Sequence, residues 1–309
     1  MKNTIKNTQT PDSIVVVADG GASGSRFAIF DRNGKRTGEA HGPPASLSLG
    51  AEAACDAIRS GLGSLGEQQY DDADWAPAHI MLGLAGAEEQ QQRQAFKQLL
   101  SPTVDCDIVT DGYAHLMGVA DGEPAICLSL GTGSVVHWHN GREHSMAGGW
   151  GFPVGDEASG AWLGRALVNA WLWSIDSSYK NHQGSATGVH TPLPGSSLIE
   201  ALKKRIGKSR SDIQYWTINA VSTDYASLVD LMLADENCND AFINDLRERG
   251  TAECRRLLAL CPEDLSVYIT GGLAPFYKDN LQNELGERLA SAKGDALDGL
   301  RLLAINRLS

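Results

Sequence analysis

The chain has 309 residues, of which 42% are hydrophobic and 21% are charged, a composition typical of a globular protein that buries a sizeable core. Its formal net charge of -12 argues against a nucleic-acid-binding surface, which needs an excess of Lys and Arg. No apolar run is long enough to span a membrane.

The six cysteines are scattered and form no C-x-x-C pair, so their pattern predicts neither a metal cluster nor a disulfide framework. Residues 1–12 are polar and lack the apolar segment of a signal peptide. We therefore expect a cytoplasmic protein. Nucleotide binding stays open despite the negative charge, because backbone N–H groups and a metal ion can hold phosphates.

The first predicted unit is a strand, a glycine-rich turn and a second strand. Residues 14–18 form a β-branched run that is typical of a buried strand, and residues 19–26 follow as the turn. An apolar strand over 27–30 then leads into Asn33-Gly34, a strong hairpin signal.

The same pattern occurs a second time further along the chain. An apolar run at 125–130 precedes a glycine-rich turn at 131–134, and a strand at 135–138 leads into Asn140-Gly141. Such a repeat favours two related domains. Chance is the alternative, because glycine-rich turns and Asn-Gly pairs are both common.

Strands and helices alternate between the two copies, which predicts a mostly parallel, doubly wound sheet. Helices follow the second copy, interrupted by one more strand. The expected helices are 51–65, 88–100, 112–120, 159–175, 196–206, 225–233, 239–261, 278–291 and 296–308, and the further strands are 80–84, 106–109, 143–147 and 265–270.

The first glycine-rich turn has the chemistry of a phosphate site. Gly20 and Gly21 let backbone N–H groups approach an anion closely, and Ser23 adds a hydroxyl donor. Asp19 is placed to hold Mg²⁺ through water, since magnesium keeps much of its hydration shell. The alternative is a plain tight turn.

The second turn offers the same chemistry through Gly131, Thr132 and Gly133, and two such turns could clamp one triphosphate from both sides. Between them, Asp111 follows a strand and opens a helix. A carboxylate in that position is either a general base or a helix N-cap. A carboxylate flanked by two phosphate-type turns suggests phosphoryl transfer.

Two later segments are further candidates. Asp156 follows a run with four glycines, and it either accepts hydrogen bonds from sugar hydroxyls or caps the following helix. Gly271 and Gly272 follow a strand, where they form either a close-approach turn beside a flat nucleoside or an ordinary strand–helix turn.

Taken in order, DGG in a hairpin, TDG, LGTGS, GGWGFPVGDEASG and ITGGLAP resemble the motif set of the sugar kinase/Hsp70/actin superfamily. The chain is most similar to the amino-sugar kinases of the BadF/BadG/BcrA/BcrD ATPase family, over about residues 14–303. The resemblance implies an α/β fold with two actin-like (ribonuclease H-like) domains and a cleft between them. The expected domains are 13–118, joined by a C-terminal helix at about 295–309, and 119–294.

The resemblance also implies the activity, an ATP- and Mg²⁺-dependent phosphorylation of the 6-hydroxyl of glucosamine or N-acetylglucosamine, with Asp111 as the base. The remaining roles follow the motifs. The ATP phosphates lie at Gly20, Gly21, Ser23, Gly131, Thr132 and Gly133, the adenosine at Gly271, Gly272 and Ala274, the sugar at Ser46, Gly149 and Asp156, and Mg²⁺ near Asp19.

The sequence also departs from the family pattern. Ala22 stands where the family often has Gly, and Ser46 or Leu47 stands where N-acetylglucosamine kinases tend to carry Asn, so unacetylated glucosamine remains an alternative. A BadF-type ATPase that activates a dehydratase is a second hypothesis, although residues 148–160 contain no cysteine to bridge an iron–sulfur cluster. A non-catalytic sugar sensor is a third. A homodimer is one expectation for the oligomeric state.

Overall fold

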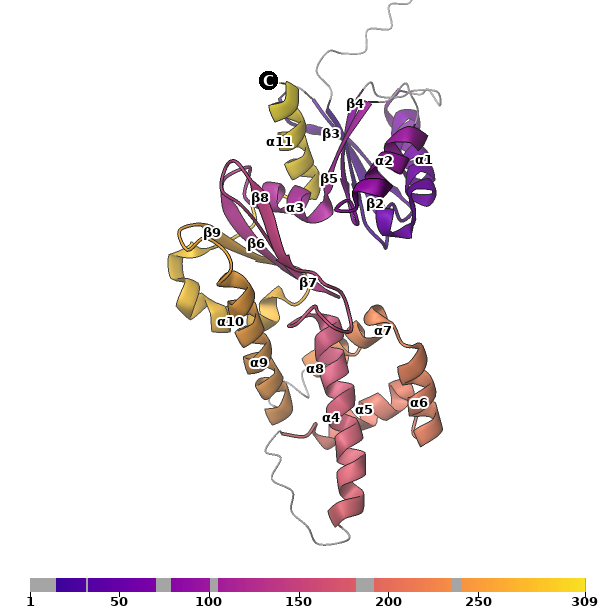
Figure 1. The fold of residues 1–309 in the computed structure, drawn as a ribbon, viewed down its shortest axis with the longest axis vertical. Helices are drawn as coiled ribbons and strands as arrows, with labels where there is room; N and C mark the ends of the chain where they lie inside the picture. Colours follow the sequence, from indigo (N-terminus) through magenta and orange to yellow (C-terminus); the bar gives the residue numbers. More distant parts are fainter. Residues whose placement is uncertain are drawn as a thin grey trace, which may run out of the picture. The chain divides into compact units, whose positions relative to one another are not determined.

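The computed structural model describes residues 15–31, 33–70, 79–100, 105–181, 192–234 and 240–308. The chain divides into two compact units, one of residues 1–124 with 291–309 and the other of residues 125–290. Figure 1 shows both units coloured along the sequence. Each unit is described by itself.

The sheet of the first unit is mixed, with strand order β3-β2-β1-β4-β5 over the described residues. β1, β2 and β3 pair antiparallel, whereas β4 and β5 join β1 in parallel. Its strands are β1 (Val15–Gly20), β2 (Ser25–Phe30), β3 (Arg36–Gly42), β4 (His79–Leu84) and β5 (Asp105–Thr110).

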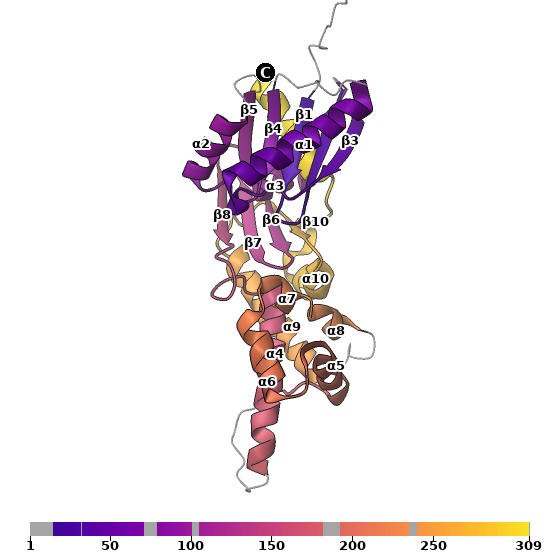
Figure 2. The same cartoon turned by 90° about the vertical axis from the view of Figure 1, so that its right-hand side faces the viewer.

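Helices cover both faces of this sheet (Figures 1 and 2). Alternate residues of β1 explain why: Val16 and Ala18 pack into a core shared with α1 (Ala51–Tyr70) and α2 (Gln90–Leu99). Their neighbours Val15 and Val17 pack into a separate core on the other face. That second core includes α3 (Asp111–Val119) and α11 (Ala296–Leu308). Burial on both faces accounts for the continuous apolar run in this strand.

Two glycines bring α3 and α11 into backbone contact. A Cβ atom on Gly118 would lie 1.7 Å from the carbonyl oxygen of Asp295, and one on Gly299 would lie 2.0 Å from the carbonyl oxygen of Ala114. No other side chain fits at these positions without separating the helices. The helix that begins at Asp111 is therefore fixed against the C-terminal helix.

The sheet of the second unit repeats the topology of the first. Its described strand order is β10-β9-β6-β7-β8, in which β6, β7 and β8 pair antiparallel and β9 and β10 join in parallel. The strands are β6 (Ala125–Leu130), β7 (Ser134–His139), β8 (His144–Gly148), β9 (Ser266–Thr270) and β10 (Leu289–Ala290).

One hydrophobic core joins this sheet to the helices of the second unit. Leu128 and Leu130 of β6 lie in the same buried cluster as Trp171, Phe242 and Tyr277. The helices are α4 (Gly160–Asn181), α5 (Ser196–Ile206), α6 (Arg210–Asn219), α7 (Ser222–Ala226), α8 (Val229–Leu233), α9 (Ala241–Leu258) and α10 (Ala274–Leu285). Short 3-10 helices occur at η1 (Leu47–Leu49) in the first unit and η3 (Gly286–Arg288) in the second.

The repeat predicted from the two Asn-Gly pairs is confirmed by the sheets and by the turns themselves. Gly34 and Gly141 both adopt a positive φ, of 77° and 89°, which glycine tolerates without strain. In the first turn the side chain of Asp31 accepts two backbone N–H groups. In the second turn the side chain of Asn140 does the same. The expectation of a mostly parallel sheet was wrong, because the two hairpins make each sheet half antiparallel.

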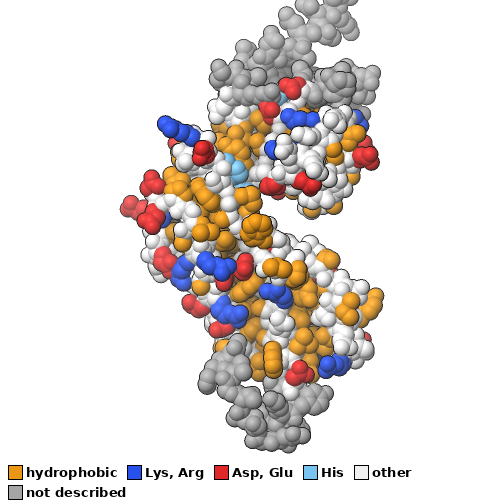
Figure 3. Space-filling model, viewed as in Figure 1, with side chains coloured by type: hydrophobic (Ala, Val, Ile, Leu, Met, Phe, Trp, Pro, Cys, Tyr) orange, Lys and Arg blue, Asp and Glu red, His pale blue; other side chains and the backbone are white. Residues whose placement is uncertain are grey.

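Among the described residues, no helix combines the length and hydropathy needed to cross a membrane. Lys, Arg, Asp and Glu side chains are interspersed on the face drawn in Figure 3.

Candidate active site

The turn between β1 and β2 is tightly constrained. Gly21 donates its N–H to the Gly24 carbonyl at 2.9 Å, and a Cβ atom on Gly20 would lie 2.6 Å from the carbonyl oxygen of Ala45. Ser23 is exposed at the tip. The turn therefore packs closely against the segment at Ala45, and its binding of phosphate stays a prediction.

Ser46 lies beside this turn, but its hydroxyl is engaged within the fold. The side chain is buried, and its Oγ donates to the Ala85 carbonyl (3.2 Å) and accepts the Ser48 N–H (3.1 Å). It therefore caps η1, and its contact with a sugar stays a prediction. Ser48, two residues later, has an exposed side chain, and the sequence did not indicate it as a site residue.

Asp111 is the first residue of α3, and it is not the helix cap. Thr110 is the N-cap, and its Oγ1 accepts the Tyr113 N–H at 3.1 Å. The Asp111 carboxylate instead accepts the N–H of Gly112 at 2.9 Å. The interpretation of Asp111 as a helix N-cap is therefore excluded, because Thr110 is the N-cap.

Burial raises the pKa of Asp111 above its usual range, although the Gly112 N–H acts in the opposite direction. The negative charges of Asp19 and Glu88 raise this pKa further. Asp19 is near because β1, β4 and β5 are parallel neighbours, so their carboxyl ends share one edge of the sheet. A carboxylate with raised proton affinity is suited to act as a general base.

Arg26 is a further charged group at this edge, and its role was not predicted from the sequence. It pairs with Asp19 across the β1–β2 hairpin, and its Nη2 lies 2.7 Å from Asp19 Oδ2. A hairpin register drawn through the glycine-rich turn would have placed the two residues opposite each other.

The second glycine-rich turn is held by the start of α4. The N–H groups of Gly160 and Ala161 bond to the carbonyls of Gly131 and Thr132 at 2.8 and 3.1 Å. Thr132 is exposed, and among the described residues its hydroxyl has no hydrogen-bond partner. This hydroxyl is therefore free to donate to a ligand.

Asp156 lies against this turn. Its carboxylate accepts the Gly151 N–H at 3.2 Å, and a Cβ atom on Gly133 would lie 2.8 Å from its Oδ2. Its φ of 61° is unusual for a residue with a side chain and marks a constrained loop. Burial raises its pKa, against the lowering effect of N–H groups from Gly151 and Ser134.

The N-cap of α4 is Ser159, whose Oγ accepts the Trp162 N–H at 3.1 Å. The capping alternative for Asp156 is therefore removed. Of the aromatic residues in the loop, Phe152 packs against Tyr225 with ring centroids 5.0 Å apart, whereas Trp150 is 87% exposed. Phe152 fills the core, and Trp150 is available to a ligand.

Gly149 and Gly271 both bring backbone onto the same turn region. Gly149, with a φ of 66°, donates its N–H to the Ser134 carbonyl at 2.9 Å. Gly271 has a φ of 90°, and a Cβ atom there would lie 2.3 Å from the Leu130 carbonyl oxygen. Gly272 is exposed, and Ala274 begins α10. The second unit thus places the predicted phosphate, sugar and adenosine segments beside one another.

The described residues contain no group of three His, Cys, Asp or Glu side chains that could hold a metal ion. Magnesium does not need such a cage, because it is usually held by one or two carboxylates, waters and substrate phosphates. Asp19, with its oxygen donors at the edge of the first turn, fits that pattern.

Comparison with known proteins extends over almost the whole chain. The model of the BadF/BadG/BcrA/BcrD ATPase family matches residues 18–295. The glucosamine kinase GspK of Vibrio cholerae is 26% identical over 289 residues, which cover 93% of this chain and 94% of the relative.

Two solved structures share the fold. One, from Chromobacterium violaceum and provisionally assigned as an N-acetylglucosamine kinase, is 29% identical with a TM-score of 0.78, covering 94% of this chain and 98% of that one. Another with the same provisional assignment, from Porphyromonas gingivalis, is 18% identical with a TM-score of 0.69, covering 96% and 100%. The two-domain α/β architecture predicted from the sequence is thereby confirmed.

Proposed function

Since the chain belongs to the BadF/BadG/BcrA/BcrD ATPase family, we propose that it is an ATP-dependent kinase that phosphorylates the 6-hydroxyl of glucosamine or N-acetylglucosamine. The observation that carries the proposal is Asp111, a half-buried carboxylate that caps no helix and whose pKa is raised by its surroundings. The amino-sugar kinase names of the full-length relatives support the substrate class.

In this mechanism Asp111 accepts the proton of the sugar hydroxyl as the hydroxyl oxygen attacks the γ-phosphorus. The bond from that phosphorus to the β,γ-bridging oxygen breaks, and ADP leaves. The raised proton affinity of Asp111 favours the proton transfer, and the hydrogen bond from the Gly112 N–H at 2.9 Å holds the orientation of the carboxylate. Phosphoryl transfer needs little covalent help from the protein, so most of the rate enhancement comes from positioning and charge stabilisation.

The glycine turns supply the positioning. In the first unit the Ser23 hydroxyl would donate to phosphate oxygens, and the absence of side chains on Gly20 and Gly21 would let a phosphate approach the turn. In the second unit the Thr132 hydroxyl would donate in the same way, between Gly131 and Gly133. The N–H groups of Gly21 and Gly131 are already bonded to the carbonyls of Gly24 and Gly133. Mg²⁺ would be held through water near Asp19, where it supplies charge neutralisation of the phosphates.

The adenosine and the sugar would bind to segments of the second unit. Gly272 leaves open space for the nucleoside between Gly271 and Ala274, and Gly149 and Asp156 would approach the sugar ring. The exposed Trp150 offers a face for the apolar side of such a ring.

A coupled assay against glucosamine, N-acetylglucosamine, glucose and N-acetylmannosamine tests the proposal. We expect one of the two named amino sugars to give the highest kcat/KM. Asp111→Asn should lower kcat by about 10²–10⁴-fold while calorimetry still shows ATP binding. ATP hydrolysis that is independent of every sugar, or an unchanged kcat in the variant, would contradict it.

The dehydratase-activating alternative has one clear requirement, a cysteine able to ligate a cluster at the surface. The cysteines in the described part of the chain are all buried: Cys55, Cys106, Cys127, Cys254 and Cys261. Burial raises the pKa of Cys106 and Cys261 to about 11 and that of Cys254 to about 12, which disfavours the thiolate form that binds iron. Cys238 lies outside the described residues. An iron assay on anaerobically purified protein distinguishes the two hypotheses.

A further inference from the structure

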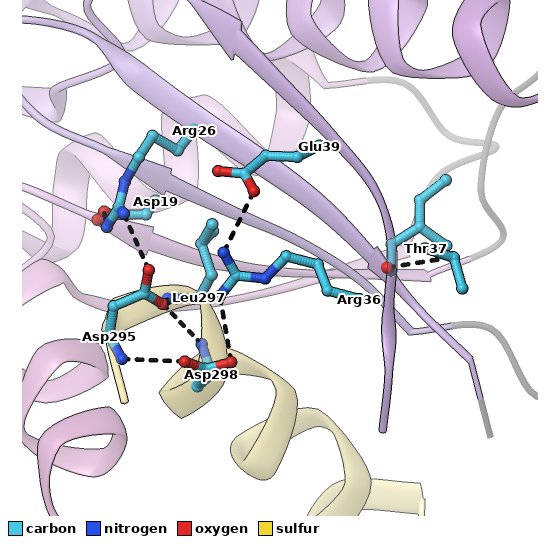
Figure 4. Close-up of polar contacts among 9 residues, drawn as sticks. Asp19, Arg26, Arg36, Thr37, Glu39, Asp295, Leu297 and Asp298 are labelled. Carbon is cyan, nitrogen blue, oxygen red and sulfur yellow. Dashed lines mark hydrogen bonds and ion pairs between the residues drawn. The ribbon is translucent and has the colours of Figure 1, made fainter. Parts of the chain in front are cut away.

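A guanidinium group joins two carboxylates at the edge of the first unit (Figure 4). Arg26 Nη2 lies 2.7 Å from Asp19 Oδ2 at the end of β1, and Arg26 Nη1 lies 3.0 Å from Asp295 Oδ2 just before α11. The planar fork of arginine suits such a bridge, because its donors have a fixed mutual geometry. The predicted magnesium carboxylate is therefore connected to the C-terminal helix.

The far end of the bridge is a fixed anchor. Asp295 Oδ1 accepts the N–H groups of Leu297 (3.0 Å) and Asp298 (3.2 Å), and Asp298 Oδ2 accepts the Asp295 N–H (3.0 Å). Arg36 Nη2 adds a third contact to Asp295 Oδ1 at 3.1 Å. A carboxylate held by so many donors has little rotational freedom, so it restrains the guanidinium bound to it.

The near end leaves one oxygen of Asp19 available. Arg26 occupies Oδ2, and no described residue makes a hydrogen bond to Oδ1. The Asp19 side chain is 19% exposed, which gives water access to it. One engaged and one open oxygen match a carboxylate that accepts a hydrogen bond from the hydration shell of Mg²⁺.

We propose that Arg26 is a positioning residue which, anchored on Asp295, orients Asp19 so that its Oδ1 faces the water shell of nucleotide-bound Mg²⁺. This inference rests on the proposed use of Mg²⁺-ATP, and it goes beyond it by assigning a role to a residue that does not contact the substrate. The alternative is that Arg26 only ties α11 to the sheet.

A matched pair of variants separates these two roles. Arg26→Gln removes the bridge to Asp19, whereas Arg36→Gln removes contacts to Asp295, Asp298 and Glu39 but none to Asp19. Both variants weaken the attachment of α11 to the sheet. Only Arg26→Gln should change the orientation of Asp19 toward the hydration shell of Mg²⁺.

The measurement is calorimetry with a non-hydrolysable ATP analogue, with and without Mg²⁺. Without Arg26, Asp19 should lose its orientation and with it the hydrogen bond to the hydration shell of Mg²⁺. Arg26→Gln should therefore reduce the gain in affinity that Mg²⁺ gives by about tenfold to a hundredfold. Metal-free affinity should stay within about twofold, since the glycine turns are unchanged. Arg36→Gln should keep the full magnesium gain, even though its melting temperature falls.

Two further variants test the same proposal if Arg26→Gln does not fold. Asp295→Asn should reproduce the loss of magnesium gain, because it releases the anchor while leaving Arg26 in place. Arg26→Lys keeps the charge but cannot reach both carboxylates as a fork, so it should lose part of the gain.

A full magnesium gain in Arg26→Gln, or an equal loss in Arg36→Gln, would overturn the positioning role. These measurements need no sugar. Failure to phosphorylate any sugar in the panel would therefore overturn the proposed function and leave this test intact, whereas a wild-type protein without magnesium gain would overturn the inference.

Discussion

At the scale of single residues, the pKa of Asp111 depends on its neighbours in a way that can be tested. Burial is the main cause of its raised value, and the like charges of Asp19 and Glu88 add to it. Glu88 is exposed, so it can be replaced without disturbing the core. A substitution of Glu88 should therefore change the pKa of Asp111 while Asp111 itself stays unchanged.

We predict that Glu88→Gln moves the acid limb of the kcat/KM profile to lower pH. A base must be deprotonated to act, and removing a nearby negative charge favours its deprotonated form, so its pKa falls. The adjacent Glu89 is also exposed and is not among the groups that shift this pKa most, so Glu89→Gln is the control. Added salt should shrink the difference. A shift to higher pH, or equal shifts in both variants, would contradict the assignment of Asp111.

Asp156 and Ser159 allow a second test at this scale, because the structure separates capping from binding. Asp156→Ala should raise the sugar KM by about tenfold to a hundredfold, the loss of a hydrogen bond of the charged class. Ser159→Ala removes the observed cap of α4 and should instead cost about 1 kcal/mol of stability, with the sugar KM unchanged. Melting temperature and KM measured on the same preparations decide it; a sugar KM unaltered in Asp156→Ala rejects the binding role.

At the scale of elements, local chemistry explains which predictions succeeded. Both hairpins were predicted because a turn depends on a few adjacent residues, and the structure shows a positive φ at Gly34 and Gly141. Helix α6 was missed although it carries its own signal, a capping box between Ser209 and Asp212. Helix α4 continues to Asn181, beyond the expected end at 175, and β10 has two residues, too few to show a period.

The contact between α3 and α11 yields a prediction about an element pair. Gly118→Ala should destabilise the protein by about 1–3 kcal/mol, because the new Cβ would meet the Asp295 backbone at 1.7 Å. Gly63→Ala is the matched control: it is also inside a helix, and a Cβ there meets nothing within 4 Å. The control should gain about 0.5–1 kcal/mol from helix propensity. Urea denaturation measures both, and equal effects would show that the two backbones do not pack as described.

At the scale of the whole molecule, the repeated topology was predictable and the composition of the site only partly so. Turns, strand ends and glycines mark where a site can form, and they indicated Asp111 and both glycine turns. Contacts between distant residues have no local signature. The approach of Asp156 to Gly133, and the bridge from Arg26 to Asp295 over 269 residues, follow only from the folded chain. Ser46 was predicted to contact a sugar, but the sequence did not show that its buried hydroxyl is hydrogen-bonded to the backbone of Ala85 and Ser48.

Ligand binding to the whole molecule gives the last prediction, which concerns Thr132. A ligand at one hundred times its Kd stabilises the folded state by about 2.7 kcal/mol, and a tenfold loss of affinity removes about 1.4 kcal/mol of that. Thr132→Val keeps the β-branched shape but removes the exposed hydroxyl from the second glycine turn. We therefore expect a smaller thermal shift with ATP and an unchanged shift with the amino sugar.

Thr217→Val is the control for this experiment, because it makes the same chemical change in α6 of the same unit, where the hydroxyl bonds to the Gln214 carbonyl. It should keep both thermal shifts. If Thr132→Val also keeps its ATP shift, the hydroxyl does not contact phosphate, and the turn acts through backbone N–H groups alone. If instead both ligand shifts fall together, the substitution has disturbed α4, whose Ala161 N–H bonds to the Thr132 carbonyl at 3.1 Å. If Thr132→Val lowers the thermal shift with ATP but not the shift with the amino sugar, the second glycine turn is assigned to ATP binding.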